Sequence, residues 1–275
     1  MKHNLKIRDH FLSNEVFNVV EHAEGVLKTH PDLDEKNLDK YYDSSQYSSH
    51  NNNGGFIGFL YSLSSYIMLR FKLRALAKYI NKESFIVDFG CGKGGFLSYL
   101  KKKKYTVVGV DNSKKARDKC LEKNLKVYKS INDIKENIDT ITFWHSFEHI
   151  SNPSEILDQI ISQSKKNLTV VIALPNHRSF DAKYYGSFWA AYDVPRHRFH
   201  YSARGIKKLM KSHGFEFLNT QPMLLDSFYI SIMSEKYKKS KLPFVKGIVV
   251  GLISNALGFF NSTYSSSVFV FKKTI

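Results

Sequence analysis

The chain has 275 residues, of which 43% are hydrophobic, so it is long enough to bury one large core, alone or with additions. Its net charge is +16, but only 8 of its 41 basic residues are arginine, which argues for lysine-covered solvent faces and against nucleic acid as a partner. The two cysteines, Cys91 and Cys120, exclude a disulfide framework and predict a reducing, cytoplasmic location.

The first 57 residues are interpreted as an irregular N-terminal extension of a main domain that covers residues 58–275. The opening sequence MKHNLKIRDHF lacks the apolar segment of a signal peptide, and no uninterrupted apolar run reaches the roughly 18 residues that a membrane span needs. A hairpin is predicted within the extension, at 15–20 and 25–28. Residues 58–80 mix apolar and basic side chains at helical spacing, which predicts a helix.

From residue 85 onward, strand and helix patterns alternate, as they do in parallel α/β sheets. The predicted strands are 85–89, 105–110, 125–129, 139–144, 168–174, 215–221 and 267–272. The predicted helices are 95–103, 113–123, 153–166 and 202–213. Two long segments interrupt this alternation. Residues 175–201 follow the fifth strand, at the edge where open sheets bind ligands, and residues 222–264 precede the last strand.

A glycine turn, VDFGCGKGGFL, joins the first of these strands to the first of these helices. Glycines let the backbone approach a ligand closely, and the helix start behind them offers free N–H groups. Gly90, Gly92 and Gly95 fit the dinucleotide pattern G-x-G-x-x-G. Asp88 with Gly90, Gly92 and Gly94 instead fits D-x-G-x-G-x-G, the pattern of S-adenosylmethionine sites. Asp88 favours the second ligand, because a carboxylate suits a cationic methionine and opposes a pyrophosphate.

A second acid, Asp111, ends the next strand pattern in the sequence VVGVD. Its carboxylate could accept hydrogen bonds from both hydroxyls of a ribose. Asn112 is close enough to share this role. The alternative is that Asp111 only caps the following helix.

Several blocks in order resemble class I S-adenosylmethionine-dependent methyltransferases, specifically the bacterial group related to ubiquinone-type O-methyltransferases. The blocks are KYYDSSQYSSH, VDFGCGKGGFL, VVGVD, DTITFWHSFEHISNP and ALPNHRSFDAKYYGSFWAAYDVPRHRFHYS. The resemblance covers about 40–275. It implies an α/β fold with a Rossmann-like, seven-stranded, mostly parallel sheet, helices on both faces and an inserted antiparallel last strand. The N-terminal extension and a helical insertion before the last strand complete the expected architecture.

The resemblance also implies the residues that hold S-adenosylmethionine. They are Asp88, Gly90, Cys91, Gly92, Gly94, Asp111 and Asn112, with Asp133 a candidate for the adenine contact. Relatives often carry an acid directly after the third strand, where this chain has Ser130. Relatives with a metal ribbon carry N-terminal cysteines, and this chain has none before Cys91.

His145, Glu148 and His149 follow the fourth strand. Their i, i+3, i+4 spacing predicts that all three share one helical face. They could remove a proton, support the cofactor pocket or bind a divalent metal, as the corresponding block is thought to do in ubiquinone-type relatives. Magnesium prefers oxygen ligands, and the first position here is a histidine, so no metal is predicted.

A second polar cluster lies in the 175–201 segment. His197 is the leading candidate for the base that deprotonates the acceptor, since an imidazole titrates near neutral pH. The candidate substrate residues are Trp189, Tyr192, Asp193, Arg196 and His200. The alternative is a structural loop held together by an Asp193–Arg196 pair.

The sequence therefore predicts a methyltransferase that acts on a small or lipid-like acceptor, at oxygen. The alternatives are a nucleic-acid or protein methyltransferase, an inactive nucleotide-binding scaffold and, more distantly, a nicotinamide-dependent enzyme. Against amino-group methylation, the sequence after the fourth strand contains Trp144-His145-Ser146-Phe147 where an Asn/Asp-Pro-Pro-Tyr/Phe tetrapeptide would stand.

The apolar sequence LPFVKGIVVGLISNALGFF in the 222–264 insertion has three interpretations: a lid over an apolar substrate, a helix on a membrane surface, or a core-packing helix pair. The sequence does not decide the acceptor or the oligomeric state.

Overall fold

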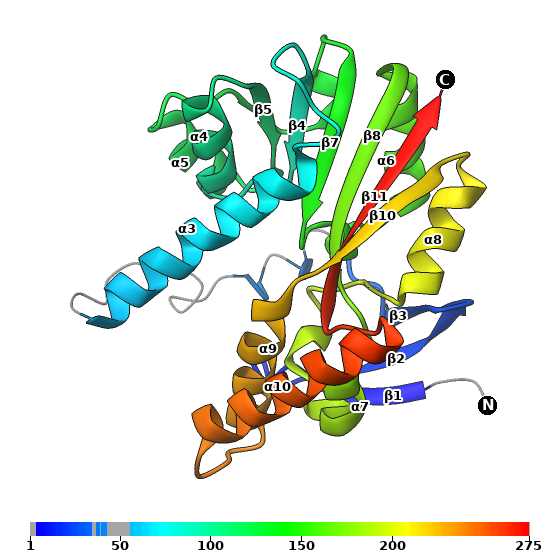
Figure 1. The fold of residues 1–275 in the computed structure, drawn as a ribbon. Coiled ribbons are helices and arrows are strands. Elements are labelled where there is room, and N and C mark those ends of the chain that lie inside the picture. The colour runs from blue at the N-terminus through cyan, green and yellow to red at the C-terminus, as the bar shows by residue number, and fades with distance from the viewer. Residues whose placement is uncertain (1–3, 35–36, 39, 43–55, 275) are drawn as a thin grey trace.

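The computed structural model describes residues 4–34, 37–38, 40–42 and 56–274; most of the lead-in block KYYDSSQYSSH lies outside them. A seven-stranded sheet forms the centre (Figure 1), in the order β10-β11-β8-β7-β4-β5-β6. The strands are β4 (Phe85–Phe89), β5 (Thr106–Val110), β6 (Val127–Tyr128), β7 (Ile138–Trp144), β8 (Ser164–Pro175), β10 (Glu216–Pro222) and β11 (Ser266–Thr274). β11 is inserted antiparallel to both neighbours. The predicted Rossmann-like fold is confirmed.

Helices connect these strands where the sequence predicts them. They are α3 (Phe56–Leu76), α4 (Gly95–Lys102), α5 (Lys114–Leu121), α6 (Pro153–Ser162) and α8 (Ala203–Ser212). Ser113, Asn152 and Ser202 cap α5, α6 and α8, because each side chain accepts a hydrogen bond from a backbone N–H in the first turn. The predicted extension of α6 to residue 166 is wrong, since β8 already begins at Ser164.

The N-terminal extension is a small sheet of its own. β1 (Asn4–Arg8), β2 (Val16–Ala23) and β3 (Val26–His30) form an antiparallel meander, and β9 (Phe199–Tyr201) pairs with β3. The predicted hairpin is confirmed as β2–β3, but the description of this region as irregular is wrong. The β3–β9 pairing ties the extension to the 175–201 segment.

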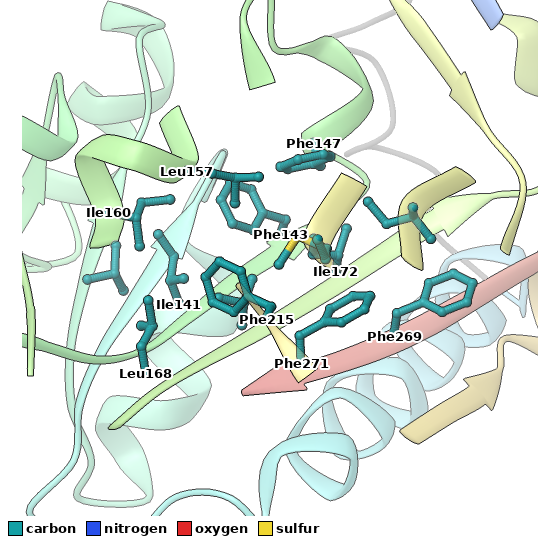
Figure 2. Close-up of a cluster of buried hydrophobic side chains, with 14 of the residues drawn as sticks. Ile141, Phe143, Phe147, Leu157, Ile160, Leu168, Ile172, Phe215, Phe269 and Phe271 are labelled. Atoms are coloured by element: carbon teal, nitrogen blue, oxygen red, sulfur yellow. The ribbon is translucent and has the colours of Figure 1, made fainter. Parts of the chain in front are cut away.

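Aromatic and aliphatic side chains fill the space beside the central sheet (Figure 2). Phe143 and Phe147 pack edge to face, with ring centroids 5.2 Å apart, and Phe269 and Phe271 come from the inserted strand β11. Phe143 is the last but one residue of β7 and Phe147 lies just beyond the strand, so this core holds the His145–His149 block in place. The carboxyl edge of the sheet is therefore a rigid support for a site.

Both insertions contain helices. The first holds α7 (Phe180–Tyr185) and the short 3₁₀ turns η3 (Gly186–Phe188) and η4 (Ala190–Tyr192); the second holds α9 (Leu224–Tyr237) and α10 (Pro243–Asn261). α10 corrects the sequence interpretation, which judged this stretch too short to span a bilayer. By length and composition it is the one helix among the described residues able to do so, with a mean hydropathy of 1.6 over 18 residues, only 28% of which are buried.

Candidate active site

The glycine turn between β4 and α4 needs its glycines. Gly90, Gly92 and Gly94 have φ values of 72°, 52° and 72°, in the left-handed region that side chains disfavour. A Cβ at Gly90 would lie 2.4 Å from Cβ of Ser146, whereas a Cβ at Gly92 would meet no atom within 4 Å. The turn is thus packed beneath Gly90 and open at Gly92, where a ligand could approach the backbone.

Asp111 faces that open position. Its Oδ2 accepts a hydrogen bond from the backbone N–H of Gly92 at 2.8 Å, and its Oδ1 accepts one from Ser113 at 2.9 Å. A carboxylate has about four lone-pair sites, so two remain for the hydroxyls of a ribose. Asn112 is exposed beside it, with its carbonyl accepting from Arg117. The arrangement fits the predicted cradle, and Ser113 rather than Asp111 is the cap of α5.

Replacing Asp111 with alanine should weaken cofactor binding about 10- to 100-fold, or about 1.4–2.8 kcal/mol, for the loss of charge-assisted hydrogen bonds. Isothermal calorimetry with S-adenosylmethionine and S-adenosylhomocysteine measures this effect. Asp118→Ala, which removes an exposed carboxylate from the same helix region, is the matched control and should bind normally. Unchanged affinity in the Asp111 variant would remove this residue from the ribose role.

Asp88 lies below the turn with only 3% of its surface exposed, and its Oδ1 accepts a hydrogen bond from the Thr142 hydroxyl at 2.7 Å. Burial raises its pKa to about 6, although nearby Lys72 of α3 works in the opposite direction. Lys72 also lies over the ring of Trp144, with Nζ 4.9 Å from the centroid. The sequence analysis missed this lysine, a cation on an apolar helix. The chain itself thus supplies a cation near Asp88, and a direct contact of Asp88 with the methionine end stays a prediction.

Two other predicted cofactor residues have local structural roles. Cys91 is buried, and its Sγ would lie 2.6 Å from a Cβ at Gly109, so only glycine fits opposite it. Asp133 is exposed and belongs to a capping box, in which its Oδ2 accepts from the backbone N–H of Ser130 at 3.0 Å. This bond occupies part of its carboxylate, and its adenine contact stays a prediction.

The predicted helical face of His145, Glu148 and His149 is wrong. His145 directly follows β7 and has a φ of 53°, which is not helical. η2 (Phe147–His149) is a single 3₁₀ turn. His145 Nε2 lies 3.0 Å from Oδ2 of Asp226 on α9, and its Nδ1 lies 3.6 Å from Glu148 Oε1. Burial would lower the pKa of His145, but the two carboxylates raise it to about 10. His145 is therefore a cation that links the block to the second insertion.

The fold brings His197 to Glu148 and His149 instead. Single ligand atoms of these three residues lie within 4.8 Å of one another. Glu148 is 1% exposed, and neither of its carboxylate oxygens has a hydrogen-bond donor. Burial would raise its pKa, but the neighbouring His145 imidazolium lowers it, so it is a carboxylate. A buried carboxylate whose cationic neighbour stays 3.6 Å away is costly, which makes this cluster a candidate functional site.

Both imidazoles of the cluster are held at Nδ1 by a backbone carbonyl. His197 Nδ1 lies 2.9 Å from the carbonyl of Ala191, and His149 Nδ1 lies 2.9 Å from that of Arg196. Because a carbonyl only accepts, each Nδ1 donates its proton to that carbonyl, so Nε2 is the atom at which each ring can gain or lose a proton. His197 Nε2 lies 3.9 Å from Glu148 Oε1. Burial and His197 lower the pKa of His149 to about 4, so that ring is neutral.

The predicted substrate residues are mostly inside the protein. Arg196 is 1% exposed and pairs with Asp193 and with Asp9 of the N-terminal extension, at 2.7 Å each. Trp189 donates from Nε1 to Asp181 at 2.7 Å. His200 Nε2 lies 2.9 Å from the Thr29 hydroxyl. A structural role fits these contacts better than a substrate wall, as the alternative interpretation of an Asp193–Arg196 pair anticipates.

A small cavity adjoins the cluster. Its lining includes Glu148, His197, Trp189, His200 and Tyr201, and buried Tyr192 lies directly behind, with its ring 5.1 Å from that of Trp189. Ser146, which lies between His145 and Glu148, donates to the carbonyl of Phe89 at 2.6 Å. Ser146 thus connects the chain segment of the cluster to the start of the glycine turn.

Comparisons with known proteins agree with this geometry. A family described as "Methyltransferase domain" matches residues 62–220, more than half of the chain. A comparison with curated proteins finds no match. Among solved structures, the fold resembles a SAM-dependent methyltransferase from Archaeoglobus fulgidus, with a TM-score of 0.50, 22% identity, and coverage of 78% of this chain and 99% of that one.

Two further structures share the fold at lower identity. Magnesium protoporphyrin IX methyltransferase from Synechocystis PCC 6803, solved with bound SAH, has a TM-score of 0.57 at 13% identity, covering 87% of this chain and 100% of that one. A cyclopropane synthase from Mycobacterium tuberculosis has a TM-score of 0.50 at 14% identity, covering 73% and 82%. The family match and the glycine turn together lead to one assignment: this chain belongs to the methyltransferase-domain family.

Proposed function

We propose that this protein transfers a methyl group from S-adenosylmethionine to the oxygen of a small or lipid-like acceptor in the cytoplasm. The observation that carries the proposal is the buried Glu148 carboxylate with the lone pairs of His149 and His197 beside it, next to the glycine turn. An acceptor hydroxyl must lose a proton when it is methylated, and these three groups are proton acceptors. The bound cofactor supplies the electrophilic methyl group.

Different residues of the chain would bind the cofactor and accept the proton. The open backbone at Gly92 and the carboxylate of Asp111 would hold the nucleoside. His197 takes the acceptor proton at Nε2, and Glu148 stabilises the imidazolium that forms. The buried cluster excludes water, and positioning of the two reactants supplies a further share of the rate.

Replacing Glu148 with glutamine should lower turnover about 10- to 100-fold while cofactor affinity stays unchanged. The amide keeps the shape but removes the charge that stabilises a protonated His197. Steady-state kinetics with calorimetry measures both quantities. Glu155→Gln, an exposed position on α6, is the matched control. A variant with normal turnover would exclude Glu148 from the reaction.

A divalent cation is a second candidate at the same three atoms. Each histidine is oriented by a carbonyl at Nδ1, which is the arrangement that histidine ligands usually have, and imidazole ligands suit zinc, iron, copper or nickel better than magnesium. Dialysis against a chelator separates the roles. Activity that persists supports the histidine as base, whereas activity that returns only with added metal supports the cation.

The acceptor is the open part of the proposal. Similar structures include a magnesium protoporphyrin IX methyltransferase and a mycolic acid cyclopropane synthase, so the fold does not choose the acceptor. A methyl-transfer screen with labelled cofactor against phenols, quinone precursors, lipids and tRNA tests it. Transfer to tRNA or to protein would favour the alternative substrate classes. Binding of neither S-adenosylmethionine nor S-adenosylhomocysteine would favour an inactive scaffold.

A further inference from the structure

Helix α10 packs on the rest of the protein through its smallest residues. Gly247, Gly251, Ser254 and Gly258, spaced three or four apart, are all buried. A Cβ at Gly247 would lie 2.6 Å from Cα of Ile232 in α9, so only glycine lets the two helices approach this closely. The inner face of α10 is therefore a close contact in which Val250 is the one larger apolar side chain among the buried residues of the helix.

The outer face of α10 carries the large apolar side chains instead. Phe259 and Phe260, near its end, are 76% and 83% exposed. The other exposed apolar residues of this face are Phe244, Val245, Ile248, Val249, Leu252, Ile253 and Leu257. An ordinary surface helix places its large apolar side chains toward the core. α10 has the opposite arrangement, with its large apolar side chains toward solvent. A continuous exposed apolar surface of this kind marks an interaction site.

Lysines gather at the α9–α10 turn, where this apolar face begins. Between residues 224 and 261 the chain has five lysines, all exposed: Lys236, Lys238, Lys239, Lys241 and Lys246. The same stretch has two acids, and neither offsets that charge at the surface, because Glu235 is 2% exposed and Asp226 pairs with His145. Figure 1 shows α9 and α10 side by side at one end of the molecule, away from the central sheet.

We propose that the α9–α10 hairpin docks on an anionic lipid membrane, with the outer face of α10 in the headgroup and upper acyl region. The exposed apolar face matches the acyl region of a membrane, and the neighbouring lysines match its anionic headgroups. A second copy of this chain would bring its own five lysines to the contact, which disfavours a symmetric dimer. A spanning helix is disfavoured because the small inner face is already packed against α9, and Ser254 donates to buried Asp181 at 2.7 Å.

Co-sedimentation with vesicles tests the proposal, using the full-length protein. We expect binding to vesicles of phosphatidylcholine with phosphatidylglycerol, and weaker binding in high salt or with phosphatidylcholine alone. The triple variant Phe244→Ser, Phe259→Ser, Phe260→Ser should bind at least about tenfold more weakly. The double variant Lys239→Glu, Lys241→Glu should also lose about tenfold, because each lysine near the surface contributes to attraction.

Matched variants elsewhere keep the test specific. Leu121→Ser and Val16→Ser remove exposed apolar side chains, and Lys129→Glu with Lys135→Glu makes the same charge change; all should bind vesicles as the wild type does. Cofactor affinity, measured by calorimetry, reports whether each variant is folded, so this test does not depend on the acceptor. Three outcomes would overturn the proposal: no vesicle binding, binding unchanged by the phenylalanine variant, or a dimer that this variant converts to monomers. Resistance to alkaline carbonate extraction would replace surface docking with a membrane span.

Discussion

Replacing His197 with alanine should lower methyl-transfer turnover by about 10²- to 10⁴-fold, the usual contribution of a general base. His197 is the ring whose free Nε2 faces both Glu148 and Asp193, at 3.9 Å each, and whose Nδ1 is held by the Ala191 carbonyl. Cofactor affinity should stay unchanged, because the glycine turn and Asp111 do not touch this ring.

The control is His213→Ala, which removes an imidazole at the end of α8, outside the cluster, and should leave turnover unchanged. Added imidazole should restore part of the activity of the His197 variant, since the cavity left by the ring adjoins an existing one. Full activity of His197→Ala without added imidazole would exclude it as the base. His149 would then be the remaining candidate, and the same experiment on that residue would decide.

The strands and helices of the main domain could be predicted because local patterns determine them. The predicted strand 85–89 coincides with β4. Ser113 and Ser202 cap α5 and α8, and serine directly before a helical pattern is a local signal for a helix start. The failures come from tertiary contacts. β9 is three residues long and exists because Lys28 to Val26 pair with Phe199 to Tyr201, far apart in sequence. No local pattern identifies such a strand.

The site divides in the same way. The cofactor turn is contiguous, so its residues could be named from the sequence. The proposed catalytic cluster is not contiguous: Arg198 donates its backbone N–H to the carbonyl of Glu148 at 2.9 Å, and this bond brings His197 to the η2 turn. His145 points to Asp226, which lies 81 positions later, and so leaves the helical face that its spacing predicts. Sequence spacing predicts neighbours only within an unbroken helix.

Replacing Arg196 with methionine should lower the free energy of unfolding by about 3–5 kcal/mol, the cost of leaving buried charges without their partner. The Arg196 guanidinium donates to Asp9, Asp193 and the carbonyl of Tyr41. The Asp9 side chain is completely buried, so water cannot replace the lost partner. Denaturant unfolding measures the difference, and we expect the N-terminal sheet to lose its attachment to the 175–201 segment.

Arg198→Met is the matched control, two residues away in the same segment. Arg198 is also buried, and its Nη1 pairs with Asp32 at 2.6 Å. Asp32 is 37% exposed and keeps Lys28 as a partner, so water and lysine can compensate. We expect a loss of about 1 kcal/mol or less. Equal losses in the two variants would show that burial of the aliphatic stem, not the buried carboxylates, dominates.

The effect of Arg196→Met should also depend on pH, with a sign set by Asp9 and Asp193. Burial alone would raise the pKa of each, but Arg196 holds both below their ordinary value of 3.8 in the wild type. A carboxyl with a lowered pKa adds stability above its unfolded pKa, and this stability is lost as the pH falls through the folded value. Without the guanidinium, the largest influence that opposes burial is gone and both pKa values rise relative to the wild type, so protonation relieves the variant at a higher pH. The gap between the proteins should therefore be largest near about pH 7 and shrink toward about pH 4; a constant gap would contradict the ion-pair origin.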